Sequence, residues 1–468
     1  GDAMMQRIYS SGLIFSSLFV LLVLSGCGEK SAEQWHEQAQ ALLEGKVLRQ
    51  LDAQVLAQAE YGQEQALVLD PTSVEATFAL AALYEARGAY EDAALLYRRL
   101  IERDSLLGRA YAGLGFSLAA QGRYSGAMRA YQDALRRGER SALLYTRLGH
   151  VYQALGHVQE HLLSARASYR AALQLDPEQV DAHAHLARVE SRLGRRDEAV
   201  ALYQQALAQE SNDDEVRVEL AALYREMGQG QVGRGVLAEG ITRAPDSPLL
   251  HQEMGRFLWE DGDGMRALEH FFKALAADAS LVLARRYMAL IYSAQGQHGQ
   301  ALAAYAELAQ LQPQDASVHV SMGIVHSQLG DLAAAEKVFK QALELGGAGG
   351  DAALKLGGLY MHQRRLRAAV KVFKEAVESH ESNAELHAAL GDVYRQLGVL
   401  RAALEAGEQA VALEPERALW RYHLASTYER AYPQRAAAEW RRYAELAAGD
   451  VREVQRLREV KEKWEKQP

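Results

Sequence analysis

The chain has 468 residues, of which 49% are hydrophobic and 24% charged, a composition typical of a globular protein with a large apolar core. Its formal net charge of −9 disfavours nucleic-acid binding, because that function needs clustered Lys and Arg to neutralise phosphates. A single cysteine excludes an internal disulfide.

The N-terminus predicts an export signal. Residues 1–3 are interpreted as the remnant of an expression tag. Arg7 then precedes an apolar run, LIFSSLFVLLVL (13–24), which is followed by small residues. A basic start, a short apolar segment and small residues together are typical of a secretory signal peptide. The run is too short to span a bilayer, which takes about 20 residues.

The one cysteine stands directly after this signal. The sequence Leu24-Ser25-Gly26-Cys27 resembles the lipobox of bacterial lipoproteins. The resemblance implies that residues 1–26 are removed and that Cys27 is acylated, which anchors the chain stably because more than one lipid chain is attached. Gly28 stands where an Asp would resemble the inner-membrane retention signal, so we expect the periplasmic face of the outer membrane. An ordinary cleaved signal with a coincidental cysteine is the alternative.

The body of the chain repeats one pattern every 34 residues. LAALYEARGAYEDAALLYRRL (80–100), LGFSLAAQGRYSGAMRAYQDA (114–134) and MALIYSAQGQHGQALAAYAEL (288–308) are three of its copies. Apolar residues recur at i, i+3 and i+4 in both halves of each copy, which predicts two amphipathic helices. Between the halves, Gly88 allows the chain to reverse without a Cβ clash.

The pattern resembles the tetratricopeptide repeat. We place eleven repeats over 74–450, with starts at residues 74, 108, 142, 180, 214, 248, 282, 316, 350, 384 and 418. The resemblance implies an all-α fold, a right-handed superhelical solenoid of stacked antiparallel helix pairs whose first helices line a concave groove.

Both ends of the array are expected to be capped. Residues 27–73 are interpreted as the lipid-anchored N-terminus followed by an atypical helical cap. Residues 451–468 are interpreted as an amphipathic capping helix that covers the last repeat with Val451, Val454, Leu457 and Trp464.

Two positions of the second helix are expected to be buried in the core. A small residue at the first lets the paired helices approach closely; it is alanine at 93, 127, 199, 267, 301, 335, 369 and 403. An aromatic residue at the second fills the gap to the next pair: Tyr97, Tyr131, Tyr169, Tyr203, Phe271, Tyr305, Phe339 and Phe373.

Two repeats depart from the pattern. Repeat three has four extra residues in GHVQEHLLSARASY (156–169), which contain the zinc-protease pattern HxxEH at 157–161. A lengthened loop, adventitious metal binding and a protease site are the three interpretations, and the absence of a protease fold favours the loop. Repeat five (LYREMGQGQVGRGVLAEGITRAP, 223–245) has glycine at packing positions 233 and 240, which indicates either a loosely packed repeat or a flexible joint near residue 230.

The sequence contains no P-loop, GxSxG or CxxC motif, so we expect a binding surface rather than an enzyme, with no cofactor and no metal site. The family resemblance implies which positions of each repeat face the groove. In repeats four to seven these positions carry a basic stripe with one tryptophan: Arg188, Arg192, Arg225, Arg256, Trp259 and Arg286. Arginine suits bidentate pairing with carboxylates, so an acidic ligand is one interpretation, and pairing with neighbouring glutamates is the other.

Two functions follow from these features. The first is a lipid-anchored periplasmic scaffold that binds a partner protein in an envelope machine, for pilus or secretin assembly, outer-membrane insertion or exopolysaccharide export. The second is direct binding of an acidic polysaccharide during export. No nucleic-acid partner is expected.

Overall fold

The computed structural model of the chain describes residues 30–43, 52–156, 158–346, 349–448 and 453–464. These residues form 25 α-helices and no strand. None of these helices combines the length and the hydrophobicity needed to cross a membrane. The predicted signal peptide and Cys27 lie outside the described residues, so the anchor stays a prediction.

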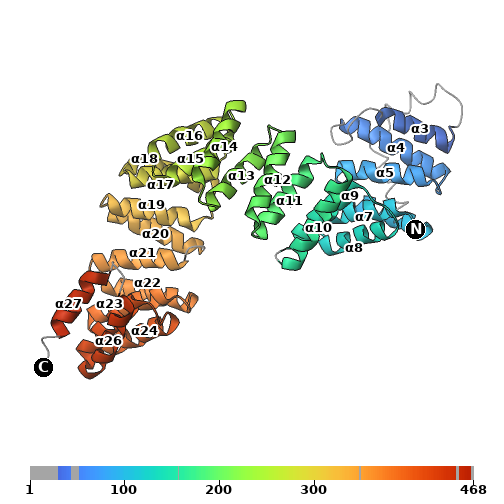
Figure 1. Cartoon of the computed structure of the whole chain (residues 1–468). Coiled ribbons are helices and arrows are strands. Elements are labelled where there is room, and N and C mark those ends of the chain that lie inside the picture. Colours follow the sequence, from blue (N-terminus) through green and yellow to red (C-terminus); the bar gives the residue numbers. More distant parts are fainter. Residues whose placement is uncertain (1–29, 44–51, 157, 347–348, 449–452, 465–468) are drawn as a thin grey trace, which may run out of the picture. The chain divides into compact units, whose positions relative to one another are not determined.

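The helices fall into two compact arrays, which divide between Gln229 and Gly230. Within each array, Figure 1 shows the helices following one another as antiparallel pairs in chain order. The N-terminal array contains α3 (Ala32–Leu43), α4 (Ala53–Leu69), α5 (Val74–Arg87), α6 (Tyr90–Arg103), α7 (Gly108–Ala120), α8 (Tyr124–Arg136), α9 (Ala142–Leu155), α10 (Gln159–Leu175), α11 (Val180–Arg192), α12 (Arg196–Gln209) and α13 (Asp214–Glu226). The C-terminal array contains α14 (Gly230–Arg243), α15 (Pro248–Glu260), α16 (Gly264–Ala277), α17 (Val282–Ala294), α18 (His298–Leu311), α19 (Ala316–Gln328), α20 (Leu332–Leu345), α21 (Gly349–His362), α22 (Leu366–Ser379), α23 (Ala384–Leu397), α24 (Leu400–Leu413), α25 (Ala418–Ala431), α26 (Pro433–Ala447) and α27 (Val454–Trp464).

The first helix of every repeat begins at the residue where the sequence places the repeat, except that α21 begins at Gly349 rather than at residue 350. Ser73, Ser141 and Ser247 cap the N-termini of α5, α9 and α15 by accepting hydrogen bonds from backbone amides. The predicted all-α repeat array is therefore confirmed.

In eight of the eleven repeats the packing of the helix pair includes a small residue and an aromatic ring at the predicted positions. The eight aromatic residues predicted to be core are all at most 5% exposed, and the eight alanines at most 1%, which confirms both predictions. In several repeats the first helix carries glycine against the ring. A Cβ added to Gly149 would lie 2.5 Å from the Tyr169 ring, and one added to Gly357 would lie 2.2 Å from the Phe373 ring. Only the absence of a side chain allows the two helices to approach so closely.

The chain ends pack as helical caps. At the N-terminal end, Gly62 of α4 lies directly against Ala39 of α3. At the C-terminal end, α27 joins a cluster containing Trp420, Trp440 and Tyr443.

The capping helix buries the predicted Leu457 but not the predicted Val454. Val454 is 52% exposed, whereas Val460 is buried and Leu457 is partly buried. Glu453 lies on the same side, because it accepts a hydrogen bond from Tyr443 Oη over 3.0 Å. Residues 453, 457 and 460 share one helix face. The hydrogen bond from Tyr443 to Glu453 orients this face toward the last repeat. Val451 and the side chain of Trp464 lie outside the described part.

Repeat five is divided between the arrays, because α13 belongs to the N-terminal array and α14 to the C-terminal one. Gly233 and Gly240 are buried in α14, and Leu237, 0% exposed, replaces the aromatic ring of other repeats. The division coincides with the glycine-rich segment; flexibility at this place stays a prediction.

Gly357→Ala should lower the free energy of unfolding by about 1–3 kcal/mol, because the new methyl group overlaps the buried Phe373 ring. The neighbouring Gly358 is the matched control. A Cβ there meets nothing within 4 Å, so Gly358→Ala should be neutral or stabilise the helix by up to about 1 kcal/mol. Urea unfolding followed by circular dichroism compares the two variants, and equal effects would contradict the packing argument.

Candidate functional site

A line of polar side chains crosses three successive first helices of the N-terminal array. It consists of His150 on α9, His185 and Arg188 on α11, and Glu219 on α13, and is called the histidine–arginine chain below. First helices line the groove in the implied family, so these residues lie on the elements where a partner is expected.

Arg188 is the central member of the histidine–arginine chain. Its Nε donates to both carboxylate oxygens of Glu219 over 2.7 Å, and its Nη1 lies 3.1 Å from His185 Nδ1. Since a guanidinium can only donate, His185 Nδ1 accepts and the imidazole proton lies on Nε2. The His150 and His185 ring centroids are 4.1 Å apart. Repeat three is thus connected to repeat four by a ring contact, and repeat four to repeat five by an ion pair.

Burial keeps the two imidazoles neutral. The Tyr169 ring stacks on His185 with the centroids 5.7 Å apart. Burial, together with the nearby His150 and Arg188, lowers the pKa of His185 to about 3. Burial also lowers the pKa of His150. Acidification therefore places positive charge in a site that already holds a guanidinium.

The other two predicted arginines of this array lie on the same helices. Arg192 ends α11 and is exposed, and Arg225 is half-buried near the end of α13. Each makes an interaction within the protein.

The C-terminal array contains the remaining predicted groove residues. Arg256 on α15 forms an ion pair with Glu253, one turn earlier. Trp259 is half-buried on the same helix, and its ring lies near Gly264, at the start of α16. Arg286 on α17 donates to Asp315 over 2.6 Å and to Gln312 over 3.2 Å.

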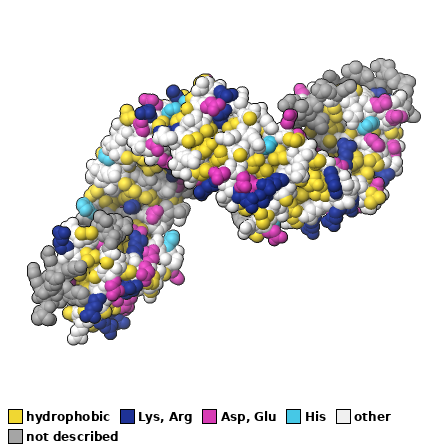
Figure 2. Space-filling model, in the orientation of Figure 1, with side chains coloured by type: hydrophobic (Ala, Val, Ile, Leu, Met, Phe, Trp, Pro, Cys, Tyr) yellow, Lys and Arg dark blue, Asp and Glu magenta, His cyan; other side chains and the backbone are white. Residues whose placement is uncertain are grey.

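The predicted basic stripe is thus not a row of unpaired cations. Arg188, Arg256 and Arg286 each bind a carboxylate of their own array. At several places on the face shown in Figure 2, Lys and Arg side chains likewise lie beside Asp and Glu side chains. An acidic ligand would have to compete with these carboxylates. A single stripe across both arrays stays a prediction.

Several other histidines have a structural role. The fourth residue of the first helix donates to the carbonyl group six residues before it in three repeats: His183 to Pro177, His251 to Pro245 and His387 to Glu381, over 2.8–2.9 Å. Arg217 makes the same bond to Ser211 over 2.7 Å. These side chains hold the turn that leads into each repeat and are not candidate ligands.

The HxxEH segment gains no support as a metal site. His157 lies outside the described residues, while Glu160 and His161 stand at the start of the longer helix α10. Within the described ranges, no group of three or more His, Cys, Asp or Glu side chains could hold a metal ion.

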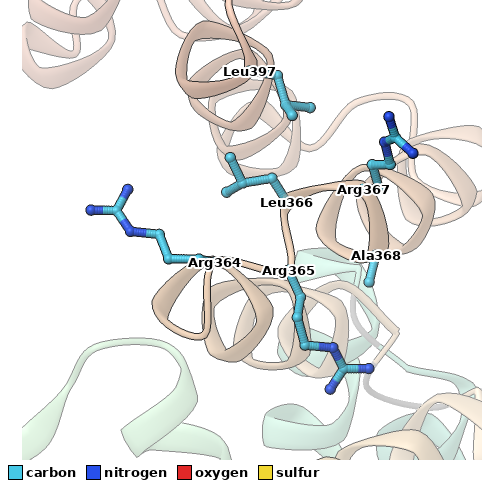
Figure 3. Close-up of a pocket in the computed structure, with 6 residues that line it drawn as sticks. All are labelled: Arg364, Arg365, Leu366, Arg367, Ala368 and Leu397. Carbon is cyan, nitrogen blue, oxygen red and sulfur yellow. The ribbon is translucent and has the colours of Figure 1, made fainter.

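A shallow hollow beside the turn between α21 and α22 contains three arginines. Arg364, with φ of 59°, is the only non-glycine residue with positive φ among those described, and it replaces the turn glycine of other repeats. In Figure 3, Arg364 and Arg367 project to opposite sides of Leu366, and Arg365 points away from Leu397. Glu336 binds Arg365 over 2.6 Å. The three guanidinium groups do not converge on one ligand.

The sequence analysis did not identify His150 and His185, the two histidines of the histidine–arginine chain. His150 occupies the ninth position of repeat three, which is the position of the predicted groove residues Arg188 and Arg256 in repeats four and six, so position alone could have identified it. His185 could not be found in this way, because its ring contacts with His150 and Tyr169 depend on how α9, α10 and α11 pack together.

Comparison with known proteins identifies the repeats. Family models described as tetratricopeptide repeat match residues 56–106, 146–215 and 320–384, residues 192–254, and residues 107–142, together more than half of the chain. The chain belongs to the tetratricopeptide-repeat family. Such proteins are protein–protein interaction scaffolds and are generally non-catalytic, so the chain is a scaffold of this type.

The chain is similar at low identity to several solved structures. A chain of the APC/C hetero-tetramer Cut9-Hcn1 has 17% identity and a TM-score of 0.37, with 92% of this chain and 96% of that chain covered. A tetratricopeptide repeat protein from Parabacteroides merdae has 16% identity and a TM-score of 0.42, with 56% and 98% covered. The C-terminal part of a repeat protein from Cytophaga hutchinsonii has 15% identity and a TM-score of 0.43, with 52% and 99% covered. No curated protein matches the sequence.

The tetratricopeptide array should become less stable as the pH falls below about 6.5, the value for histidine in an unfolded chain. Burial lowers the pKa of His185 to about 3 in the N-terminal array and that of His270, on α16 of the C-terminal array, to about 4. Their contribution is complete above about pH 6.5 and is lost on acidification. Thermal unfolding between about pH 7 and pH 5 measures the effect. His185→Gln keeps an acceptor for Arg188 but cannot titrate, so it should make the dependence less steep, while His150 and His270 still contribute. An unchanged slope in this variant would contradict the assignment.

Proposed function

We propose that the chain is a lipid-anchored scaffold on the periplasmic face of the outer membrane. Through its tetratricopeptide groove it binds a protein of an envelope machine, in pilus or secretin assembly, outer-membrane insertion or exopolysaccharide export. The lipobox supports the location, and the repeats support the class of function.

The histidine–arginine chain is the observation that supports the binding face. Arg188 and Glu219 are about one-third exposed, and each is held in place by the other. Side chains fixed in this way lose little conformational freedom when a partner binds, and a partly desolvated arginine is a frequent anchor of interfaces. The proposed partner presents hydrogen-bonding groups to Arg188 and Glu219.

An acidic polysaccharide is the second candidate ligand. The arginines on α11, α13, α15 and α17 favour it, because guanidinium groups pair well with carboxylates. The carboxylates that already bind Arg188, Arg256 and Arg286 weigh against it.

Capture from detergent-solubilised envelope tests the binding face. The native chain should recover a defined envelope protein, and Arg188→Gln should reduce its recovery at least fivefold, because it removes the donor to both His185 and Glu219. Arg243→Gln is the matched control: it deletes one charge from an exposed pair with Glu239 on α14.

The outcomes separate the two ligands. If the native chain, Arg188→Gln and Arg243→Gln all recover the same partner equally, the scaffold function would be supported. The proposed binding face around Arg188 would then be wrong. Recovery of anionic glycan alone, with binding that weakens as salt is added, would support the polysaccharide function instead.

The anchor has its own test. Cys27→Ala should release the chain from the membrane fraction, because the thiol that carries the lipid is gone. The native chain should stay bound at about 1 M salt, where charge interactions are screened within about 3 Å. Membrane association that survives Cys27→Ala, or native association that is lost in salt, would count against lipidation.

A further inference from the structure

One buried carboxylate in the N-terminal array is surrounded by three arginines. Glu190 of α11 is 0% exposed. Its Oε1 accepts from Arg166 Nε over 2.7 Å and from Arg170 Nη2 over 3.0 Å, both on α10. Its Oε2 lies 3.8 Å from Arg195 Nε, just before α12, and accepts no hydrogen bond from any described residue. The three arginines and Glu190 are called the arginine cluster below.

Other repeats show what this position requires for folding. Glu190 is the eleventh residue of its helix, a position where a tyrosine hydroxyl elsewhere bonds a residue twenty positions earlier. These contacts join Tyr84 to Glu64 over 3.2 Å, Tyr152 to Gln132 over 2.9 Å and Tyr224 to Gln204 over 3.1 Å. Glu190 and Arg170 have the same separation. One contact is therefore sufficient to join a second helix to the next repeat.

The arginine cluster has more positive charge than the single contact between α10 and α11 needs. Three guanidinium groups face one carboxylate, and no other described carboxylate pairs with them. Arg170 and Arg195 are 49% and 42% exposed, so each presents unused N–H donors to solvent. Arg166 is only 18% exposed and completes the base of the site. Like charges gathered in this way repel one another unless an anion joins them.

We propose that the arginine cluster is a binding site for one doubly charged oxyanion of the phosphate or sulfate class, either free or as a terminal monoester. The excess of two positive charges matches a dianion. Planar guanidinium groups from two elements bind a tetrahedral oxyanion well. Glu190 positions the arginines, and Arg170 and Arg195 contact the anion. The site is separate from the groove residues and does not depend on the proposed scaffold function.

Titration of the full chain with inorganic phosphate at constant ionic strength tests the site. Thermal unfolding should shift upward and saturate, because a ligand that binds only the folded state stabilises it. Arg195→Gln, at a half-exposed position, should weaken the apparent affinity at least tenfold. Arg401→Gln is the control, since it removes the same charge from a 92% exposed side chain on α24.

A second variant separates binding from folding. Glu190→Tyr combined with Arg170→Gln installs the Tyr–Gln pair of repeats three and five, so it should fold with native helix content and lose the phosphate response. Sulfate and methyl phosphate should compete with phosphate, whereas dimethyl phosphate and acetate, which are monoanions, should not. A native-like response in either variant, the same loss in Arg401→Gln, or equal competition by acetate would overturn the proposal.

Discussion

Many repeats in both arrays depend on contact between a residue with little or no side chain on the first helix and an aromatic ring on the second. At Gly149 and Gly357 a single added carbon would lie within 2.5 Å of the ring, so the distance between the helices is set by the ring itself. Because the ring also reaches the next pair, one contact determines both the packing within a repeat and the stacking between repeats.

Polar contacts at fixed positions of the first helix then join successive repeats to one another. The fourth residue of several first helices bonds the preceding turn, and the eleventh bonds the second helix of the preceding repeat. Against this regular background, departures become informative. Glu190 replaces a tyrosine and gathers three arginines, and Arg364 replaces a turn glycine. The first departure makes a convergent site, and the second does not, because its side chains diverge.

Much of this fold could be predicted from the sequence because its contacts are local. Each helix packs mainly on its chain neighbours, so the 34-residue period located every first helix, with one start displaced by a residue at Gly349. The aromatic and alanine positions were found for the same reason. The face of α27 was wrong at Val454, because a hydrogen bond between Tyr443 and Glu453 orients that helix.

The sequence by itself determined the all-α repeat architecture and the buried positions, since both follow from periodicity along one chain. Tertiary structure alone decided how the charged and polar side chains are paired. It showed Arg188 between His185 and Glu219, Arg286 on Asp315, and Glu190 among Arg166, Arg170 and Arg195. Ion pairs between helices depend on the rotation of each helix about its axis and on side-chain rotamers. Neither is encoded in a spacing.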